Sequence, residues 1–169
     1  MWVFGYGSLM WDGWQTQHGC IRQMLADLPG YSRAFNKVSV RNWGSTLNPC
    51  PTLSLRKTEG NNGNCRGMAF EFPDSRRQRV LAYLVKRGDP PTELPIRLDD
   101  GTHVRAAVPL YTGPNIITKK TPDQIATMIR TTRGRDGPCL EYVKGIAEKL
   151  KELGIVDAEV QAVWEAVKG

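Results

Sequence analysis

The stretch Trp2-Val3-Phe4-Gly5-Tyr6-Gly7-Ser8-Leu9-Met10-Trp11 decides how this chain is interpreted. Its apolar start, Trp2 to Phe4, predicts a buried strand that breaks at once into small residues. Glycine lets another group approach the main chain closely, so a turn of this kind presents backbone N–H groups beyond the strand end. Such a concavity suits a carboxylate, a phosphate or a developing oxyanion. The alternative is an ordinary tight turn whose aromatic side chains belong to the core.

Length and composition fit one ordinary domain covering residues 1–169. Hydrophobic residues make up 40% of the chain and charged residues 24%, values typical of a soluble globular protein. The net charge of +6 favours soluble anionic partners. No basic stripe alternates with aromatic residues and no apolar run is long enough to cross a bilayer, so we expect neither nucleic acid nor membrane as a partner.

The four cysteines, Cys20, Cys50, Cys65 and Cys139, form no Cys-x-x-Cys pair. Without a secretory signal pattern, the sequence predicts a cytoplasmic protein with no disulfide framework. A metal site needs three or four ligands, and His18-Gly19-Cys20 is the only close His/Cys pair, so we expect no metal. The turn also lacks the Lys of a P-loop and the third Gly of a dinucleotide fingerprint.

Alternating or apolar segments predict strands in the first two thirds of the chain, and residues 52–56 with 65–72 resemble a hairpin across the Glu59–Asn64 turn. Two more strands, 94–98 and 104–111, flank an Asp-Asp-Gly turn. Residues 11–17 are expected to be loop and 21–28 a short turn of helix. A helix is expected after Pro73, and three more in the last third of the chain, from Thr121 to about Thr132, from Cys139 to Leu153 and from Asp157 to Lys168. This order predicts an α+β fold, a small mixed β-barrel or sheet flanked by helices, with C-terminal helices.

The residues match a known pattern along nearly the whole chain. The opening stretch resembles the N-terminal signature of the ChaC-like γ-glutamylcyclotransferases. The following segments resemble later motifs of the same family: 30–35, 48–55, 67–70, 80–84 and 137–142. The resemblance implies a cofactor-free enzyme in which the α-amine of a γ-glutamyl group attacks its own γ-carbonyl and releases 5-oxoproline.

The resemblance also implies site residues. Tyr6, Gly7, Ser8 and Leu9 would wrap the γ-glutamyl group of a glutathione-like small molecule, and the C-terminal Tyr142 would contribute to binding. The family takes and returns the proton with one glutamate in an Arg-Glu motif after a helix, and here Gly88 follows Arg87.

Because glycine cannot act as a general acid or base, Asp89 and Glu93 are the neighbouring acids that could replace the glutamate. A catalytically silent γ-glutamyl-binding or interaction protein is the alternative function. A third alternative is a glycine introduced by engineering to trap substrate.

Overall fold

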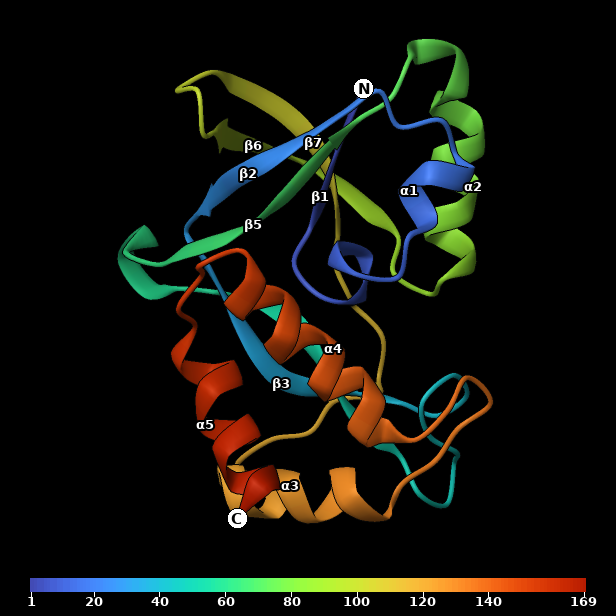
Figure 1. Ribbon diagram of the computed structural model, residues 1–169, viewed down its shortest axis with the longest axis vertical. Coiled ribbons are helices and arrows are strands. Elements are labelled where there is room, and N and C mark those ends of the chain that lie inside the picture. Colours follow the sequence, from blue (N-terminus) through green and yellow to red (C-terminus); the bar gives the residue numbers. More distant parts are fainter. The chain divides into compact units, whose positions relative to one another are not determined.

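Five strands close into a barrel in the computed structural model, which describes residues 1–169. Around the barrel the order is β1-β5-β2-β6-β7, and β3 pairs with β4 in a separate two-stranded sheet (Figure 1). The strands are β1 Trp2–Gly5, β2 Arg22–Pro29, β3 Tyr31–Ser39, β4 Cys50–Lys57, β5 Asn64–Glu71, β6 Pro91–Leu98 and β7 His103–Pro109. The helices are α1 Trp14–Gln17, α2 Arg77–Lys86, α3 Pro122–Thr131, α4 Cys139–Glu152 and α5 Ala158–Lys168. Short 3₁₀ turns lie at Ser8–Met10 (η1), Glu59–Asn61 (η2) and Asp74–Arg76 (η3). The α+β class with a small mixed barrel is confirmed.

The chain divides into two compact units. The first contains Met1–Ser32 with Leu55–Thr112, and the second contains Arg33–Ser54 with Gly113–Gly169. The prediction of one domain over the whole chain therefore stays a prediction. None of the helices has the length and apolar character needed to span a bilayer.

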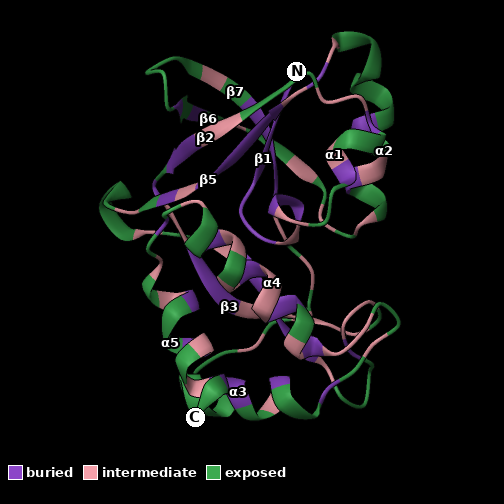
Figure 2. Cartoon of the chain, viewed as in Figure 1, coloured by how far each residue is buried: buried purple, intermediate pink, exposed green.

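In the first unit, β1 lies between β5 and β7 in the wall of the barrel. It pairs antiparallel with β5 and parallel with β7, so every residue from Trp2 to Gly5 is buried (Figure 2). A continuous apolar run suits a strand that has neighbours on both sides and contacts the core. The two strands predicted around the Asp-Asp-Gly turn are confirmed, and they form a hairpin in which β6 and β7 pair from Pro91 opposite Pro109 to Arg97 opposite His103.

In the second unit, the expected helix boundaries are confirmed. Thr121 and Gln124 form a complete capping box at the start of α3. Asp157 caps α5 by accepting from the Val160 N–H at 3.1 Å. The second oxygen of Asp157 accepts from Arg33 at 3.0 Å, which ties this helix start to β3.

Two secondary-structure predictions for the N-terminal segment are wrong. The helical turn expected at residues 21–28 is replaced by β2, Arg22–Pro29, and the expected loop of residues 11–17 contains α1. The β2 sequence has no β-branched residue, but it pairs along its full length with β5, which shows that strand partners override local propensity.

The expected hairpin between residues 52–56 and 65–72 is also wrong. β4 pairs with β3, whereas β5 lies between β1 and β2. The turn between β4 and β5 instead contacts Gly30, because the Gly30 N–H donates a hydrogen bond to Gly63 O at 2.7 Å. Alternation along a strand identifies its faces but not its partner.

Cys50 and Cys139 form a disulfide in the second unit, which corrects the expectation of unpaired thiols. The bond joins β4 to the start of α4, with the two Cα atoms 5.6 Å apart. A sequence separation of 89 conceals this proximity in the sequence. Cys20 and Cys65 form no disulfide.

Candidate active site

The turn after β1 leaves several backbone donors available. Its 3₁₀ helix is closed by bonds from Met10 N–H to Gly7 O and from Trp11 N–H to Ser8 O, both of 3.0 Å. No hydrogen bond within the protein uses the amide N–H of Gly7, Ser8 or Leu9. The first N–H groups of a helical turn have no partner inside it, so these three remain to receive acceptor oxygens.

Two glycines bring β1 and β5 close together beneath the turn. A Cβ on Gly67 of β5 would lie 2.4 Å from Gly5 O and 2.9 Å from Phe4 Cζ. Such distances are too short for any side chain, so only glycine fits at position 67. This packing fixes the end of β1, and with it the start of the turn.

Buried hydrogen bonds hold both ends of the turn. The Tyr6 hydroxyl donates to Pro109 O at 2.9 Å, which anchors the turn to the end of β7. The Trp14 indole N–H donates to Leu9 O at 3.1 Å. Because both contacts are buried, the turn is held rigidly and is largely preorganised for a ligand.

Arg87, at the end of α2, reaches the turn from the other side. Its Nη2 donates to Ser8 Oγ at 2.6 Å, and its Nη1 donates to Asp12 Oδ2 at 2.6 Å and to the Tyr83 hydroxyl at 2.8 Å. Burial opposes the charged form, but Asp12 and Tyr83 outweigh it and raise the pKa of the Arg87 guanidinium. Arg87 is therefore a permanent cation beside the turn.

An aromatic group supports Arg87 and α1 together. The Tyr83 ring stacks on Trp14 with a centroid separation of 5.4 Å and an interplanar angle of 5°. His18 lies 4.3 Å from the Tyr83 ring, and its Nδ1 is 2.8 Å from Trp14 O. These contacts limit the motion of the Tyr83 side chain, which in turn holds the guanidinium of Arg87.

Gly88, where the family glutamate is expected, terminates α2. It has a φ of +105°, and its N–H donates to Val85 O at 3.0 Å. A glycine in this conformation after a helix is a common C-terminal stop. A Cβ built on Gly88 would meet no atom within 4 Å, so there is open space at this position.

The two acids predicted to replace the glutamate have different surroundings. Asp89 is half-buried and precedes Pro90, whose carbonyl accepts from Leu110 N–H next to the Tyr6 acceptor Pro109. The Glu93 carboxylate is exposed and forms ion pairs with Arg77 at 3.6 Å and Arg105 at 3.7 Å, neither of which belongs to the turn.

Tyr142 lies on α4 in the second unit, whereas the other predicted site residues lie in the first. Its hydroxyl accepts from Leu53 N–H at 3.0 Å, and its ring is 5.7 Å from that of Trp43. Cys139, which forms the disulfide to Cys50, lies one helical turn before it.

Sequence reasoning missed two residues that contact the turn or its neighbours, Asp12 and Arg87. Arg87 was visible only as the residue before Gly88, and Asp12 only as a polar residue in an expected loop. The described residues contain no group of three or more His, Cys, Asp or Glu side chains gathered as metal ligands.

Comparison with known proteins identifies the family. The family model described as ChaC-like protein matches residues 1–169, and the chain belongs to this family. The glutathione-specific γ-glutamylcyclotransferase of Escherichia coli is 29% identical over 99% of this chain and 73% of its own length. The human glutathione-specific γ-glutamylcyclotransferase 1 is 26% identical over 99% of this chain and 78% of its own.

A solved structure shares the fold. The yeast γ-glutamylcyclotransferase specific to glutathione superposes with a TM-score of 0.85 at 19% identity, over 99% of this chain and 95% of that one. The γ-glutamylcyclotransferase fold implied by the opening motif is therefore confirmed.

Proposed function

We propose that this chain is a γ-glutamylcyclotransferase that releases 5-oxoproline from glutathione or a related γ-glutamyl compound. The observation that carries the proposal is the turn after β1, whose Gly7, Ser8 and Leu9 amides are available as donors beside the cation of Arg87. Family membership over residues 1–169 supports it, and so do relatives whose names specify glutathione.

In the proposed reaction, the α-amine of the γ-glutamyl group attacks the γ-carbonyl carbon. The new C–N bond closes the five-membered ring as the original amide C–N bond breaks. The attacking nitrogen loses two protons in all, one before and one after it forms the new bond, and the departing amine takes up both; for glutathione this amine is cysteinylglycine. Tyr6, Gly7, Ser8 and Leu9 would bind the γ-glutamyl group, whereas the part of Tyr142 stays a prediction from the sequence.

The proton transfer requires a base within hydrogen-bonding reach of the α-amine. Of the two acids that the sequence nominates, Asp89 is our first choice. It follows Gly88 directly, and it precedes Pro90, whose carbonyl accepts from Leu110 N–H next to the Tyr6 acceptor Pro109. Glu93 is the second choice, since its carboxylate would have to leave its ion pairs with Arg77 and Arg105 before it could reach the substrate.

The test is to incubate the purified chain with glutathione and to measure 5-oxoproline by mass spectrometry. We expect turnover, and we expect Asp89→Asn to lower kcat by about 100-fold, the usual contribution of a positioned acid or base. If Glu93→Gln alone abolishes turnover, the role passes to Glu93. Asp99→Asn, which removes a carboxylate that pairs with Arg66 elsewhere in the same unit, is the matched control.

Gly88 favours a second candidate function, a γ-glutamyl-binding protein without catalysis. A chain that binds 5-oxoproline but turns over none of a panel of γ-glutamyl peptides and amines would support this function over the first. We also propose a cytoplasmic location, in which the Cys50–Cys139 disulfide would be exposed to cellular thiols only through local opening, because both cysteines are fully buried.

A further inference from the structure

The guanidinium of Arg87 has more donors than the protein uses. Arginine carries five N–H donors in a planar fork. Three of them go to Asp12, Tyr83 and Ser8, which leaves the Nε–H and one Nη2 N–H without a protein acceptor. Two donors on neighbouring nitrogens of one planar group are the arrangement that receives a carboxylate through both oxygens.

The position of Arg87 fits a ligand held in the turn. One of its contacts is the hydroxyl of Ser8, which lies among the unpaired amides. The Arg87 side chain is 28% exposed, so it is accessible to a ligand yet shielded enough for its charge to act strongly. Its two other partners, Asp12 and Tyr83, hold the group in place before any ligand arrives.

We infer that Arg87 binds the α-carboxylate of the γ-glutamyl group, with Asp12 and Tyr83 as positioning residues. This inference rests on the proposed function and assigns one of the two charges of the γ-glutamyl head. The α-carboxylate does not react, so its contact with Arg87 stabilises the bound substrate and the transition state alike. Loss of the contact then raises KM much more than it lowers kcat.

Two small ligands isolate this contact. 5-Oxoproline and 2-pyrrolidinone have the same lactam ring, but only 5-oxoproline carries the carboxylate. The wild-type chain should bind 5-oxoproline about 10- to 100-fold more tightly, the range expected for hydrogen bonds to a charged group. In Arg87→Gln the ratio of the two dissociation constants, measured by titration calorimetry, should fall close to one.

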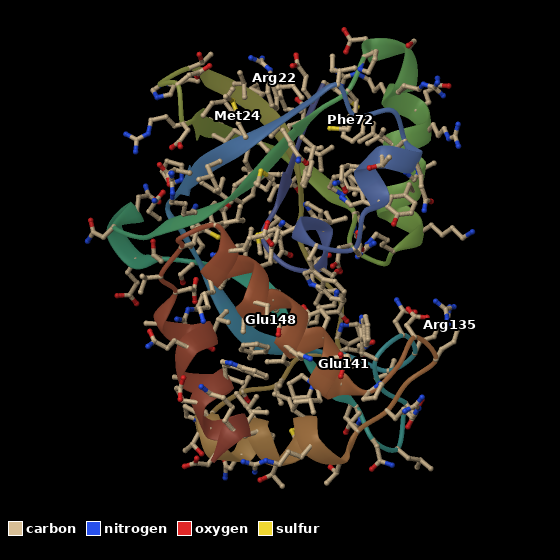
Figure 3. All side chains as sticks on the ribbon, in the orientation of Figure 1. Arg22, Met24, Phe72, Arg135, Glu141 and Glu148 are labelled. Carbon is tan, nitrogen blue, oxygen red and sulfur yellow. A yellow bond between two sulfur atoms is a disulfide. The ribbon has the colours of Figure 1, made fainter.

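The matching substrates are glutathione and 4-aminobutanoyl-cysteinylglycine, which lacks the α-carboxylate and would cyclise to 2-pyrrolidinone. Wild type should prefer glutathione through KM, and Arg87→Gln should lose that preference. Arg87→Lys, which keeps the charge but not the fork, should fall between the two. Arg22→Gln is the matched control, because Arg22 projects from β2 of the same unit and pairs with Glu71 at 2.9 Å (Figure 3).

The outcomes separate the inference from the proposed function. If Arg87→Gln stays folded and still prefers 5-oxoproline over 2-pyrrolidinone as strongly as wild type does, the assignment of Arg87 is overturned. The same holds if the wild-type chain binds both lactams equally. If the wild-type chain binds neither lactam and turns over no γ-glutamyl compound, the proposed function itself fails. If Arg87→Gln also loses binding of 2-pyrrolidinone, its turn is disturbed, and Arg87→Lys becomes the deciding variant. A preference of Arg87→Lys for 5-oxoproline that is weaker than that of wild type supports the inference, and an unchanged preference overturns it.

Discussion

Arg87 Nη2 donates to Ser8 Oγ at 2.6 Å, across 79 positions of sequence, and so joins the end of α2 to the turn after β1. The same guanidinium pairs with Asp12, whose backbone N–H donates to Ser8 O at 3.1 Å. Ser8, Asp12 and Arg87 thus form a closed set of contacts. The position of α2 and the shape of the turn are coupled through this set.

Removing the charge of Asp12 should loosen Arg87 without removing it. In Asp12→Asn the amide can still accept from Trp14 N–H, as Asp12 Oδ1 does at 3.2 Å, but it no longer forms an ion pair with Arg87. We expect KM for glutathione to rise about 5- to 30-fold, the equivalent of about 1–2 kcal/mol for a partly buried charged contact, with kcat changed less than KM.

The measurement is steady-state kinetics with urea unfolding of the same samples. Asp99→Asn serves as the control, since it breaks a pair of similar length, 2.7 Å to Arg66, away from Arg87. A fall in kcat with KM unchanged would show that Asp12 acts on the chemical step and not through Arg87.

The disulfide should contribute strongly to the stability of the second unit. Cross-linking a loop of this length restricts the unfolded chain and stabilises the folded state by about 4 kcal/mol in the chain-entropy account. We therefore expect the double variant Cys50→Ser/Cys139→Ser to unfold at lower urea than wild type, and reduced wild type to resemble it. Cys20→Ser, at a free cysteine, is the control. Equal urea midpoints for oxidised and reduced wild type would contradict the expectation.

The opening stretch was the most predictable part of the fold and of the site. Its apolar run is short and continuous and gives way at once to small residues, so the local sequence predicts both the strand and the turn. The β6–β7 hairpin and the capped helices α3 and α5 were predictable for the same reason. Each depends on contacts between residues close in sequence.

The parts of the structure that the sequence did not predict depend on contacts between residues far apart in sequence. β2 is a strand because β5 supplies its partners, and Cys50 meets Cys139 only in the folded chain. The contact of Arg87 with Ser8, which brings Arg87 to the turn, is not revealed by any local sequence pattern. Asp89 was found because it adjoins a known motif, and its role stays a prediction.

Asp27 should make the stability of the first unit depend on pH. Burial opposes the charged form of this carboxylate, but hydrogen bonds from Asn64, Arg97 and Arg66 outweigh it and lower its pKa. A carboxyl group with a depressed pKa in the folded state stabilises the protein above its unfolded pKa, near 4. That stabilisation is lost as the pH falls through the lower, folded value.

We expect Asp27→Asn to lower the free energy of unfolding by about 1–3 kcal/mol at pH 7, because it leaves two arginines without their shared acceptor. The difference from wild type should shrink as the pH falls below 4. Urea titrations at pH 7, 5 and 3 measure it, with the exposed Glu165→Gln as the control. A difference that is constant across these pH values would mean that the charge of Asp27 contributes nothing.

Gly88→Glu places a carboxylate where the family has its glutamate, and so tests whether the native chain lacks a well-placed base. The open space around Gly88 gives a new side chain room, but the φ of +105° is unfavourable for any residue with a Cβ. We expect this variant to lose about 1–2 kcal/mol of stability. Gly88→Gln has nearly the same size and the same backbone strain, so the difference between the two variants reports the carboxylate alone.

If the native chain depends on a poorly placed acid, Gly88→Glu should raise kcat for glutathione by at least about 10-fold over Gly88→Gln. The gain should persist when Asp89→Asn is added, because the new glutamate would then supply the base. If Asp89 already fills the role, Gly88→Glu brings no gain and Asp89→Asn abolishes turnover in both backgrounds. Measuring 5-oxoproline release from the four combinations therefore shows which carboxylate near the end of α2 takes the proton.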